Sequence, residues 1–356
     1  MINLGIVGTG HIFKKQLEAL STLNDEYNLV AVCDTNPEHL SACGLPKEIQ
    51  YSNYHSFIQT PGLNTIMIST PPATHYELTK AALNAGKNVL LEKPAVLEFS
   101  QMNELYAIAE KNHSLLHIAF HAAFAKDINW FLLHKNEIIP FPYRKITCEF
   151  FDPYMINGII QDERISLGGC YIDSGVNALS VCDRLVSLSS FILVSHDELK
   201  QETQNSTVYH SNCVFQSNEC NILIKTAWDK GINKKHTILE FKDTSDIIDL
   251  DHSEQSVKLF SGGNQRILYV TVKSATVLPH QALSCNNRDK TKVYDCIPLY
   301  SIGFDRTRIA WEWYCVKWDQ SYQGKQQSRR VVTSGRGVPQ QRIECAKLVR
   351  AKRHCR

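Results

Sequence analysis

The alternation of short apolar runs with helical patterns over the first third of the chain is the feature that most constrains its fold. Alternating strands and helices are typical of βαβ units, in which each helix crosses over a parallel sheet. The apolar runs predict strands at Asn3–Val7, Leu29–Cys33, Thr65–Ser69, Asn88–Leu91 and Leu115–Phe120. The helical patterns lie at His11–Leu23, Glu77–Asn84 and Phe99–Lys111. We therefore expect an α/β domain with a parallel sheet over residues 1–120.

From Tyr143 onward the pattern changes to strands that hairpins would join. These strands are expected at Lys145–Phe151, Ser190–Ser195, Val208–Phe215, Asn221–Trp228 and His236–Phe241. In this half only Gly175–Leu188 reads as a helix. The pattern predicts a second α/β domain over residues 121–265, with a mixed, largely antiparallel sheet whose open face could cover a ligand. A chain of 356 residues accommodates two domains.

Composition excludes several classes of protein. Hydrophobic residues make up 43% and charged residues 21% of the chain, which is typical of a globular protein with a buried core. No apolar run approaches the ~20 residues of a membrane span, and the first residues show no secretory signal. We therefore expect a cytoplasmic protein that does not enter a membrane. The 12 cysteines show no metal-ligand spacing, so they read as reduced thiols and no metal site is predicted.

A glycine-rich turn joins the first predicted strand to the first predicted helix. The turn contains Gly8, Gly10, His11 and Ile12, and Phe13 stands where the dinucleotide-binding fingerprint has its third glycine. Glycines at such a turn let backbone N–H groups approach a pyrophosphate at the positive end of a helix. The position of the turn, after a strand and before a helix, favours a dinucleotide site over a plain turn.

An acidic residue follows the second predicted strand. Asp34 stands 24 residues after Gly10, where a carboxylate can bind both hydroxyls of an adenosine ribose. No Lys or Arg occurs in residues 35–38 to neutralise a 2′-phosphate. The sequence therefore favours NAD as cofactor, with NADP as the less favoured alternative.

Two further segments follow predicted strands, at the sheet edge that lines the ligand crevice in open α/β folds. With the glycine turn they read GTGHI (residues 8–12), STPPATH (69–75) and LLEKPAV (90–96). In this order and spacing they resemble the glucose–fructose oxidoreductase, inositol dehydrogenase and rhizopine-catabolism (Gfo/Idh/MocA) family. The resemblance covers roughly residues 1–265. It implies an NAD(P)-binding Rossmann domain followed by an open-faced α/β domain.

The resemblance also implies roles for individual residues. The lysine that matches Lys93 reaches the nicotinamide and the substrate hydroxyl in this family. The residues that line the cofactor match Thr70, Pro71, His75 and Glu92.

Residues 166–179 resemble the second signature of the family, in which an aspartate is followed four residues later by a histidine. The aspartate matches Asp173, but Asn177 replaces the histidine. This departure removes the usual general base and resembles the subgroup of D-galactose and L-arabinose 1-dehydrogenases. His121 stands where that subgroup has a substrate-facing histidine, although Ala122 and Ala123 depart from its pattern.

These groups suit the oxidation of the C1 hydroxyl of an aldose to a lactone. Lys93 and Asn177 can stabilise charge that develops on the reacting oxygen, and either Asp173 or His121 can take the proton. Alone, Asp173 would serve as a helix cap about as often, and His121 would more often be a packed core residue. The remaining histidines, among them His39, are expected to be surface or packing residues.

Two other functions stay open at this stage. One is oxidation of a ring hydroxyl of an inositol-like polyol, and the other is a catalytically idle sensor that binds the dinucleotide and regulates a partner. The expected partners are a small sugar or polyol and, because relatives commonly pair through the open sheet, a second copy of the chain.

The end of the chain departs from the rest in charge. Residues 281–356 hold 16 Lys and Arg but 6 Asp and Glu, whereas residues 1–280 carry a net negative charge. We treat residues 266–356 as an atypical basic tail, either a binding appendage or a segment displaced by a frameshift. The frameshift is favoured and nucleic-acid binding disfavoured, because the resemblance stops abruptly. A frameshifted chain would lack its closing helices and be unstable or inactive.

Overall fold

The computed structural model describes residues 2–21, 26–96, 98–165, 167–202 and 206–271. Most of the predicted basic tail, residues 272–356, lies outside the described residues. None of the helices in the described ranges is both long and apolar enough to cross a membrane.

The first sheet is parallel throughout and has the strand order β3-β2-β1-β4-β5-β6. Its strands are β1 (Ile2–Val7), β2 (Tyr27–Cys33), β3 (Gln50–Tyr51), β4 (Thr65–Ile68), β5 (Asn88–Glu92) and β6 (Leu116–Ala119). The order reverses direction between β1 and β4. In open α/β sheets such a reversal opens a crevice at the carboxyl ends of the strands, and ligands bind there. The predicted parallel sheet is confirmed.

The connections of this sheet are helical. They contain α1 (Phe13–Ser21), α2 (Pro37–Ala42), η1 (Lys47–Ile49), α3 (Tyr54–Ile58), α4 (Pro72–Asn84) and α5 (Phe99–Lys111). The sequence analysis missed β3, α2 and α3, which are short. The helix predicted at Glu77–Asn84 corresponds to α4, which begins earlier, at Pro72. A proline is well accommodated in the first turn of a helix. The positive φ of Gly86, 70°, turns the chain just beyond the end of α4.

The second sheet is mixed and largely antiparallel, as predicted. Its order is β10-β11-β12-β7-β13-β14-β15-β16, and only the neighbouring strands β12 and β7 run parallel. The strands are β7 (Tyr143–Phe151), β10 (Ile192–Gln201), β11 (Thr207–Gln216), β12 (Asn221–Ala227), β13 (Lys234–Phe241), β14 (Ile247–Asp251), β15 (Ser256–Ser261) and β16 (Asn264–Val270). A small hairpin of β8 (Met155–Ile156) and β9 (Ile159–Ile160) stands apart from it.

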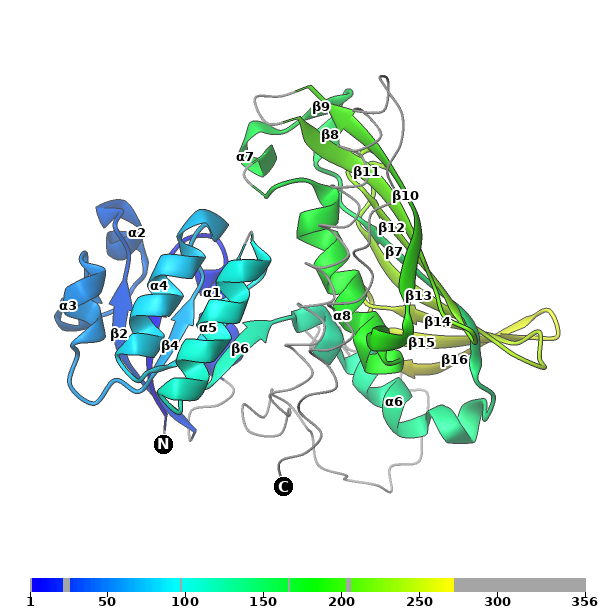
Figure 1. Ribbon diagram of the computed structural model, residues 1–356, viewed down its shortest axis with the longest axis horizontal. Helices are drawn as coiled ribbons and strands as arrows, with labels where there is room; N and C mark the ends of the chain where they lie inside the picture. The colour runs from blue at the N-terminus through cyan, green and yellow to red at the C-terminus, as the bar shows by residue number, and fades with distance from the viewer. Residues whose placement is uncertain (1, 22–25, 97, 166, 203–205, 272–356) are drawn as a thin grey trace, which may run out of the picture. The chain divides into compact units, whose positions relative to one another are not determined.

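The predicted set of helices in this half is wrong in number. Besides α8 (Val176–Leu185), which lies along one face of the sheet (Figure 1), the domain contains α6 (Lys126–Ile138) and the short α7 (Asp162–Ile165). Shorter helical turns are η2 (His121–Phe124), η3 (Tyr171–Gly175) and η4 (Leu188–Ser190). Helix α6 buries Ile128 and Phe131 but leaves Leu133 exposed, so its apolar stripe is narrow in the sequence.

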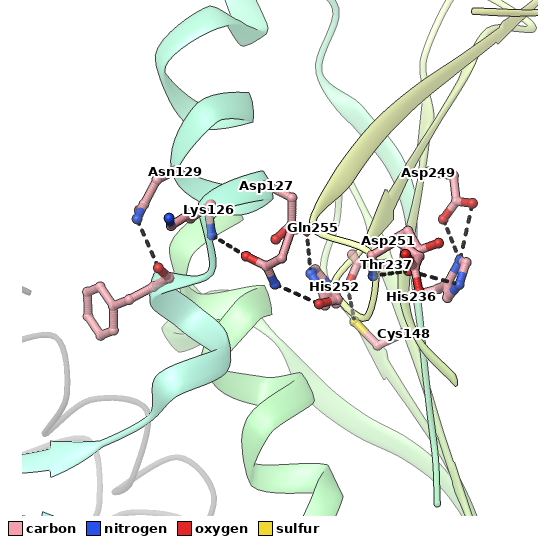
Figure 2. A network of polar contacts seen from close by, with 12 residues as sticks. Lys126, Asp127, Asn129, Cys148, His236, Thr237, Asp249, Asp251, His252 and Gln255 are labelled. Carbon is pink, nitrogen blue, oxygen red and sulfur yellow. Dashed lines mark hydrogen bonds and ion pairs between the residues drawn. The ribbon is translucent and has the colours of Figure 1, made fainter. Parts of the chain in front are cut away.

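A buried polar chain fixes the start of α6 to the sheet (Figure 2). The Asp127 carboxylate, which is fully buried, contacts Nδ1 of His252 at 2.5 Å. Nε2 of His252 lies 2.8 Å from Oγ1 of Thr237 on β13, and that oxygen lies 3.4 Å from Sγ of Cys148 on β7. Four elements of the domain are thereby joined through side chains with little access to water.

Candidate active site

The glycine turn after β1 is built by close approach of two backbone segments. Gly8 has φ +93°, and a Cβ atom at this position would lie 2.6 Å from the carbonyl oxygen of Ser69. Its N–H donates to the carbonyl of Cys33 at 2.8 Å. Gly8 therefore brings the turn against the ends of β2 and β4, and packing alone already requires a glycine here.

The start of α1 offers donors for an anion. Among the described residues, the structure shows no protein acceptor for the backbone N–H groups of Gly10, His11 and Ile12. His11 and Ile12 are exposed, and the nearest atom to a Cβ built at Gly10 is 3.8 Å away. Unpaired N–H groups at the positive end of a helix bind phosphate well. The residues present thus fit the pyrophosphate of a dinucleotide.

Asp34 ties the glycine turn to the end of β2. Its Oδ2 accepts the N–H and the hydroxyl of Thr9 at 2.8 and 3.1 Å, and its Oδ1 accepts the N–H of Asn36 at 2.8 Å. Partial burial raises the pKa of Asp34, but the hydrogen bonds from Asn36, Thr9 and His39 outweigh this and lower the pKa below its usual value. The carboxylate stays ionised, as binding of ribose hydroxyls requires.

His39 is a functional candidate that sequence reasoning missed. We expected a surface or packing residue, but its Nδ1 lies 3.2 Å from Oδ2 of Asp34. Cε1 of its ring is also the atom that lies 3.8 Å from a Cβ built at Gly10. In the sequence His39 stands five residues after Asp34. The short helix α2, which carries His39, was not predicted.

The loops after β4 and β5 lie at the same edge of the sheet. His75 is buried between them, with one ring nitrogen 2.7 Å from the carbonyl oxygen of Thr70 and the other 2.9 Å from that of Pro94. Burial lowers the pKa of His75 despite these carbonyls, so the neutral ring donates to only one of them at a time. His75 thus joins the two loops, and its contact with a cofactor stays a prediction.

The other predicted cofactor residues in these loops are placed as follows. Pro71 is exposed at the N-terminus of α4, and the Thr70 hydroxyl accepts from Thr74 at 2.7 Å. Glu92 ends β5, and burial raises the pKa of its carboxyl group while the adjacent Lys93 opposes the rise. Its Oε1 lies 3.5 Å from the Gln16 amide of α1.

An ion pair joins the first sheet to the second signature of the sequence. Nζ of Lys93 lies 2.6 Å from Oδ1 of Asp173 and donates to the backbone carbonyl of the same residue at 2.9 Å. Both side chains are largely buried, with 15% and 10% of their areas exposed. Two of the three ammonium hydrogens are thereby used, and among the described residues the third has no acceptor.

Asp173 lies on a helical turn of unusual geometry. Residues Tyr171–Gly175 form a π-helical turn that leads into α8, and such turns occur often at functional sites. Gly169, with φ +100°, precedes it, and a Cβ atom there would lie 2.8 Å from the carbonyl oxygen of Val208 on β11. Gly169 therefore allows the chain to pass close to the sheet before it turns.

Asn177 lies in the first turn of α8, four residues after Asp173. It is 7% exposed, and its Oδ1 is buried without a hydrogen-bond partner among the described residues. An unsatisfied buried acceptor costs roughly 1–3 kcal/mol, which a substrate hydroxyl could recover.

His121 follows β6, the strand next to β5, so it and Lys93 leave neighbouring strands at the same edge. Part of its surface is exposed, but the surrounding protein excludes much of the water from around the ring. Desolvation and the positive charge of Lys93 lower the pKa of His121 to about 4, whereas Asp173 opposes the shift. The imidazole is therefore neutral near pH 7.

A second lysine–carboxylate pair was missed by the sequence analysis. Nζ of Lys235 on β13 lies 2.6 Å from Oδ1 of Asp152, which follows β7, and it donates to the carbonyl of Phe151 at 2.8 Å. Oδ2 of Asp152 accepts the Ser174 hydroxyl at 2.7 Å. No motif marked these residues, because the sheet pairing of β7 with β13 brings them together.

The described residues offer no arrangement typical of a metal centre. No group of three or more His, Cys, Asp or Glu side chains within them could hold a metal ion. The cysteines that the structure describes are free thiols, and most are buried.

The fold and the site together define a class: a Rossmann-like domain with a dinucleotide crevice, followed by a domain with a mostly antiparallel sheet that brings an acid to the lysine beyond β5. Residues 2–120 match the family model for Gfo/Idh/MocA, described as an oxidoreductase family with an NAD-binding Rossmann fold. Residues 2–120 are thus similar to the NAD-binding Rossmann domain of that oxidoreductase family.

Curated relatives match the same third of the chain. An uncharacterized oxidoreductase of Schizosaccharomyces pombe is 30% identical over 121 residues, 33% of this chain and 33% of its own length. An inositol 2-dehydrogenase/D-chiro-inositol 3-dehydrogenase of Lactiplantibacillus plantarum is 30% identical over 129 residues, 35% of this chain and 37% of its own. The matches thus span about a third of the length of these relatives.

Solved structures extend the likeness of fold to both domains. A UDP-N-acetylglucosamine 3-dehydrogenase of Acidithiobacillus ferrooxidans has a TM-score of 0.61 at 15% identity, covering 77% of this chain and 85% of that one. A 3-ketoreductase of Actinomadura kijaniata, in complex with TDP-benzene and NADP, has a TM-score of 0.64 at 17% identity, covering 76% and 83%. These structures show that the arrangement of two sheets is that of known dehydrogenases and reductases.

Proposed function

We propose that the protein is an NAD-dependent dehydrogenase that oxidises the C1 hydroxyl of an aldose to a lactone. The contact between Lys93 and Asp173 carries this proposal. It places an ammonium group and a carboxylate together beyond the carboxyl end of β5, beside the crevice where a dinucleotide binds in this fold. An alcohol oxidation needs such a pair, one group to stabilise the developing alkoxide and one to receive its proton.

The charge of each residue determines its proposed role. The remaining hydrogen of the Lys93 ammonium would donate to the substrate oxygen and stabilise its negative charge. Asp173 would receive the hydroxyl proton. His121, with a pKa of about 4, is neutral at pH 7 and holds a proton too weakly to keep it, so it serves as a hydrogen-bond acceptor.

The N–H groups at the start of α1 and the carboxylate of Asp34 would hold the dinucleotide. A bound nicotinamide would accept the hydride that leaves the substrate carbon. We propose NAD over NADP, because Asp34 is ionised and residues 35–38 offer no cation to a 2′-phosphate.

The substrate class rests on Asn177. An amide in place of the histidine at this position resembles the galactose and arabinose 1-dehydrogenases, and its buried Oδ1 lacks a hydrogen-bond partner among the described residues. Incubating the full-length protein with NAD and a panel of aldoses and inositols, while NADH is followed by absorbance, tests the proposal. NADH formation with an aldose and appearance of the lactone are expected. Turnover of inositols alone would contradict C1 oxidation.

An inositol-type polyol dehydrogenase is the second candidate. The relative from Lactiplantibacillus plantarum, named as an inositol dehydrogenase, favours it, but the match is confined to the first domain, which binds the cofactor rather than the substrate. A sensor that binds NAD without turnover is the third candidate. It has no need for the Lys93–Asp173 pair, and the same panel identifies it by binding without NADH.

The setting of this activity is also a proposal. We place the protein in the cytoplasm, with a small sugar or polyol as its ligand and neither a membrane nor nucleic acid as partner. Pairing of two copies through the second sheet is expected, and light scattering of the purified chain measures it.

A further inference from the structure

A second ammonium–carboxylate pair lies beside the first. Asp152 and Lys235 stand at the end of β7 and the start of β13, and Ser174, the neighbour of Asp173 in the chain, donates to Asp152. The two pairs are therefore connected through one peptide unit and one hydroxyl. Asp152 exposes 10% of its side chain and Lys235 exposes 21%, values close to those of the first pair.

The charges of the two pairs act on the same groups. Desolvation lowers the pKa of the Lys235 ammonium, and Asp152 and Asp173 oppose this while Lys93 adds to it. Lys93 and Lys235 both lower the pKa of His121. The geometric link between the two pairs is the Ser174 hydroxyl, which donates to Asp152 from the residue next to Asp173.

The neighbouring lysine on β13 provides a contrast. Lys234 points to the other face of the sheet, where Glu149 accepts from it and from Lys225. In that cluster one carboxylate takes two ammonium groups on the outer face. Lys235 instead uses two of its hydrogens on Asp152 and Phe151, and among the described residues the third has no acceptor.

Stability alone gives a weak reason for a half-buried ion pair, because its desolvation offsets most of its Coulomb attraction. A lysine with a free hydrogen beside a carboxylate with free lone pairs can both donate to and accept from a hydroxyl. The same combination in the first pair is assigned to the reacting hydroxyl.

We propose that Lys235 and Asp152 form a second hydroxyl-binding site, which selects substrates that carry a hydroxyl group next to the reacting one. This inference rests on the proposed function for the position of the reacting hydroxyl. For an aldose that reacts at C1, the neighbouring group is the C2 hydroxyl.

The test compares D-galactose with 2-deoxy-D-galactose, using the full-length protein with NAD. In the wild type, loss of the C2 hydroxyl is expected to lower kcat/KM about 10- to 100-fold, the typical range for a hydrogen bond to a charged group. In Lys235→Met the activity with galactose falls by the same factor, whereas the activity with 2-deoxygalactose changes little. The two effects are then not additive, as required when one removes the partner of the other.

Two further variants keep this result interpretable. Asp152→Asn retains the shape of the side chain and is expected to reduce the preference for galactose. It replaces Lys235→Met as the test if that variant fails to fold. Lys234→Met, on the opposite face of the same strand, is the matched control and keeps the full preference. An undiminished preference in both Lys235→Met and Asp152→Asn, or equal losses on the two sugars, would overturn the inference.

A direct binding measurement separates this inference from the proposed function. If the wild type forms no NADH from any aldose, C1 oxidation fails, and calorimetric binding of myo-inositol against a deoxyinositol then decides the inference. A preference for myo-inositol that Lys235→Met abolishes supports the second hydroxyl site. A protein that binds both inositols equally, or neither sugar nor inositol, overturns it.

Discussion

At the scale of single residues, Lys93 is the group on which the proposed chemistry depends most. Lys93 follows a strand of the first sheet and contacts Asp173 on a helical turn of the second domain. The two residues are 80 positions apart in the sequence. The pairing could not be predicted from spacing, because no local pattern fixes where the second domain places its helical turn. The identity of both residues was predictable, since each belongs to a motif at the end of an element.

Substitution of this lysine is the first prediction. Lys93→Met is expected to lower kcat about 1,000-fold while NAD affinity changes less than about threefold, because the ammonium acts on charge that develops in the transition state. Stopped assays for NADH and calorimetry with NAD measure the two quantities. Near-normal kcat would remove Lys93 from the catalytic role, and Lys87→Met, outside the site, is the control.

The second prediction concerns the ionisation of His121. The pKa of its imidazole lies at about 4, below the ordinary 6.5, so between these values the unfolded chain binds more protons than the folded one. The contribution of this residue to stability is therefore present above pH 6.5 and is lost as the pH falls toward 4. A histidine titration by nuclear magnetic resonance measures the pKa directly.

The same titration tests the proximity of Lys93 without any assay of turnover. In Lys93→Met the pKa of His121 is expected to rise, since a repelling charge is gone and Asp173 is left without its partner. An unchanged pKa in this variant would contradict the proximity of Lys93 and His121.

Cofactor preference is the third prediction at this scale. Asp34→Ser combined with Thr35→Arg is expected to move the preference at least tenfold toward NADP, because it removes a carboxylate and adds a guanidinium that binds a phosphate with two parallel hydrogen bonds. The ratio of kcat/KM for the two cofactors measures the change. A wild type that already prefers NADP would show that Asp34 does not exclude the 2′-phosphate.

At the scale of elements, prediction from the sequence succeeded where burial was continuous. The strands β1, β4 and β5 lie in a parallel sheet, and their nearly unbroken apolar runs are visible in the sequence. Helix α6 was missed because its buried apolar residues, Ile128 and Phe131, form only a narrow stripe. The strands β14 to β16 were missed because Asp249, Asp251 and Lys258 place charges in the pattern, where ion pairs on one sheet face hold them.

The buried chain that begins at Asp127 leads to the fourth prediction. Asp127→Ala removes one partner of a fully buried contact with His252 and is expected to lower the free energy of unfolding by about 3 kcal/mol. Glu104→Ala, which breaks an exposed pair with Lys80, is the control and should leave the free energy of unfolding nearly unchanged, because water screens such pairs. Denaturant unfolding curves measure both, and equal losses would contradict the importance of the buried chain.

At the scale of the whole molecule, every residue assigned to the site precedes residue 272. A chain that ends after Thr271 is therefore the fifth prediction: its NAD affinity should lie within about twofold of the full-length value. Calorimetry measures this. A large loss would show that residues 272–356 contribute to the folded protein. Translation of the other two reading frames beyond residue 265 tests the frameshift separately, by whether either encodes an amphipathic, family-like end.

The contact between Lys93 and Asp173 also has a consequence for the order in which a newly made chain acquires activity. The predicted cofactor residues all occur before residue 94, so a nascent chain can complete its dinucleotide pocket early in synthesis. The acid and the second lysine arrive much later, at residues 173 and 235. Through that interval the ribosome-bound chain would bind cofactor without consuming it, and a captured dinucleotide would stabilise the first domain by mass action while the second is still being made.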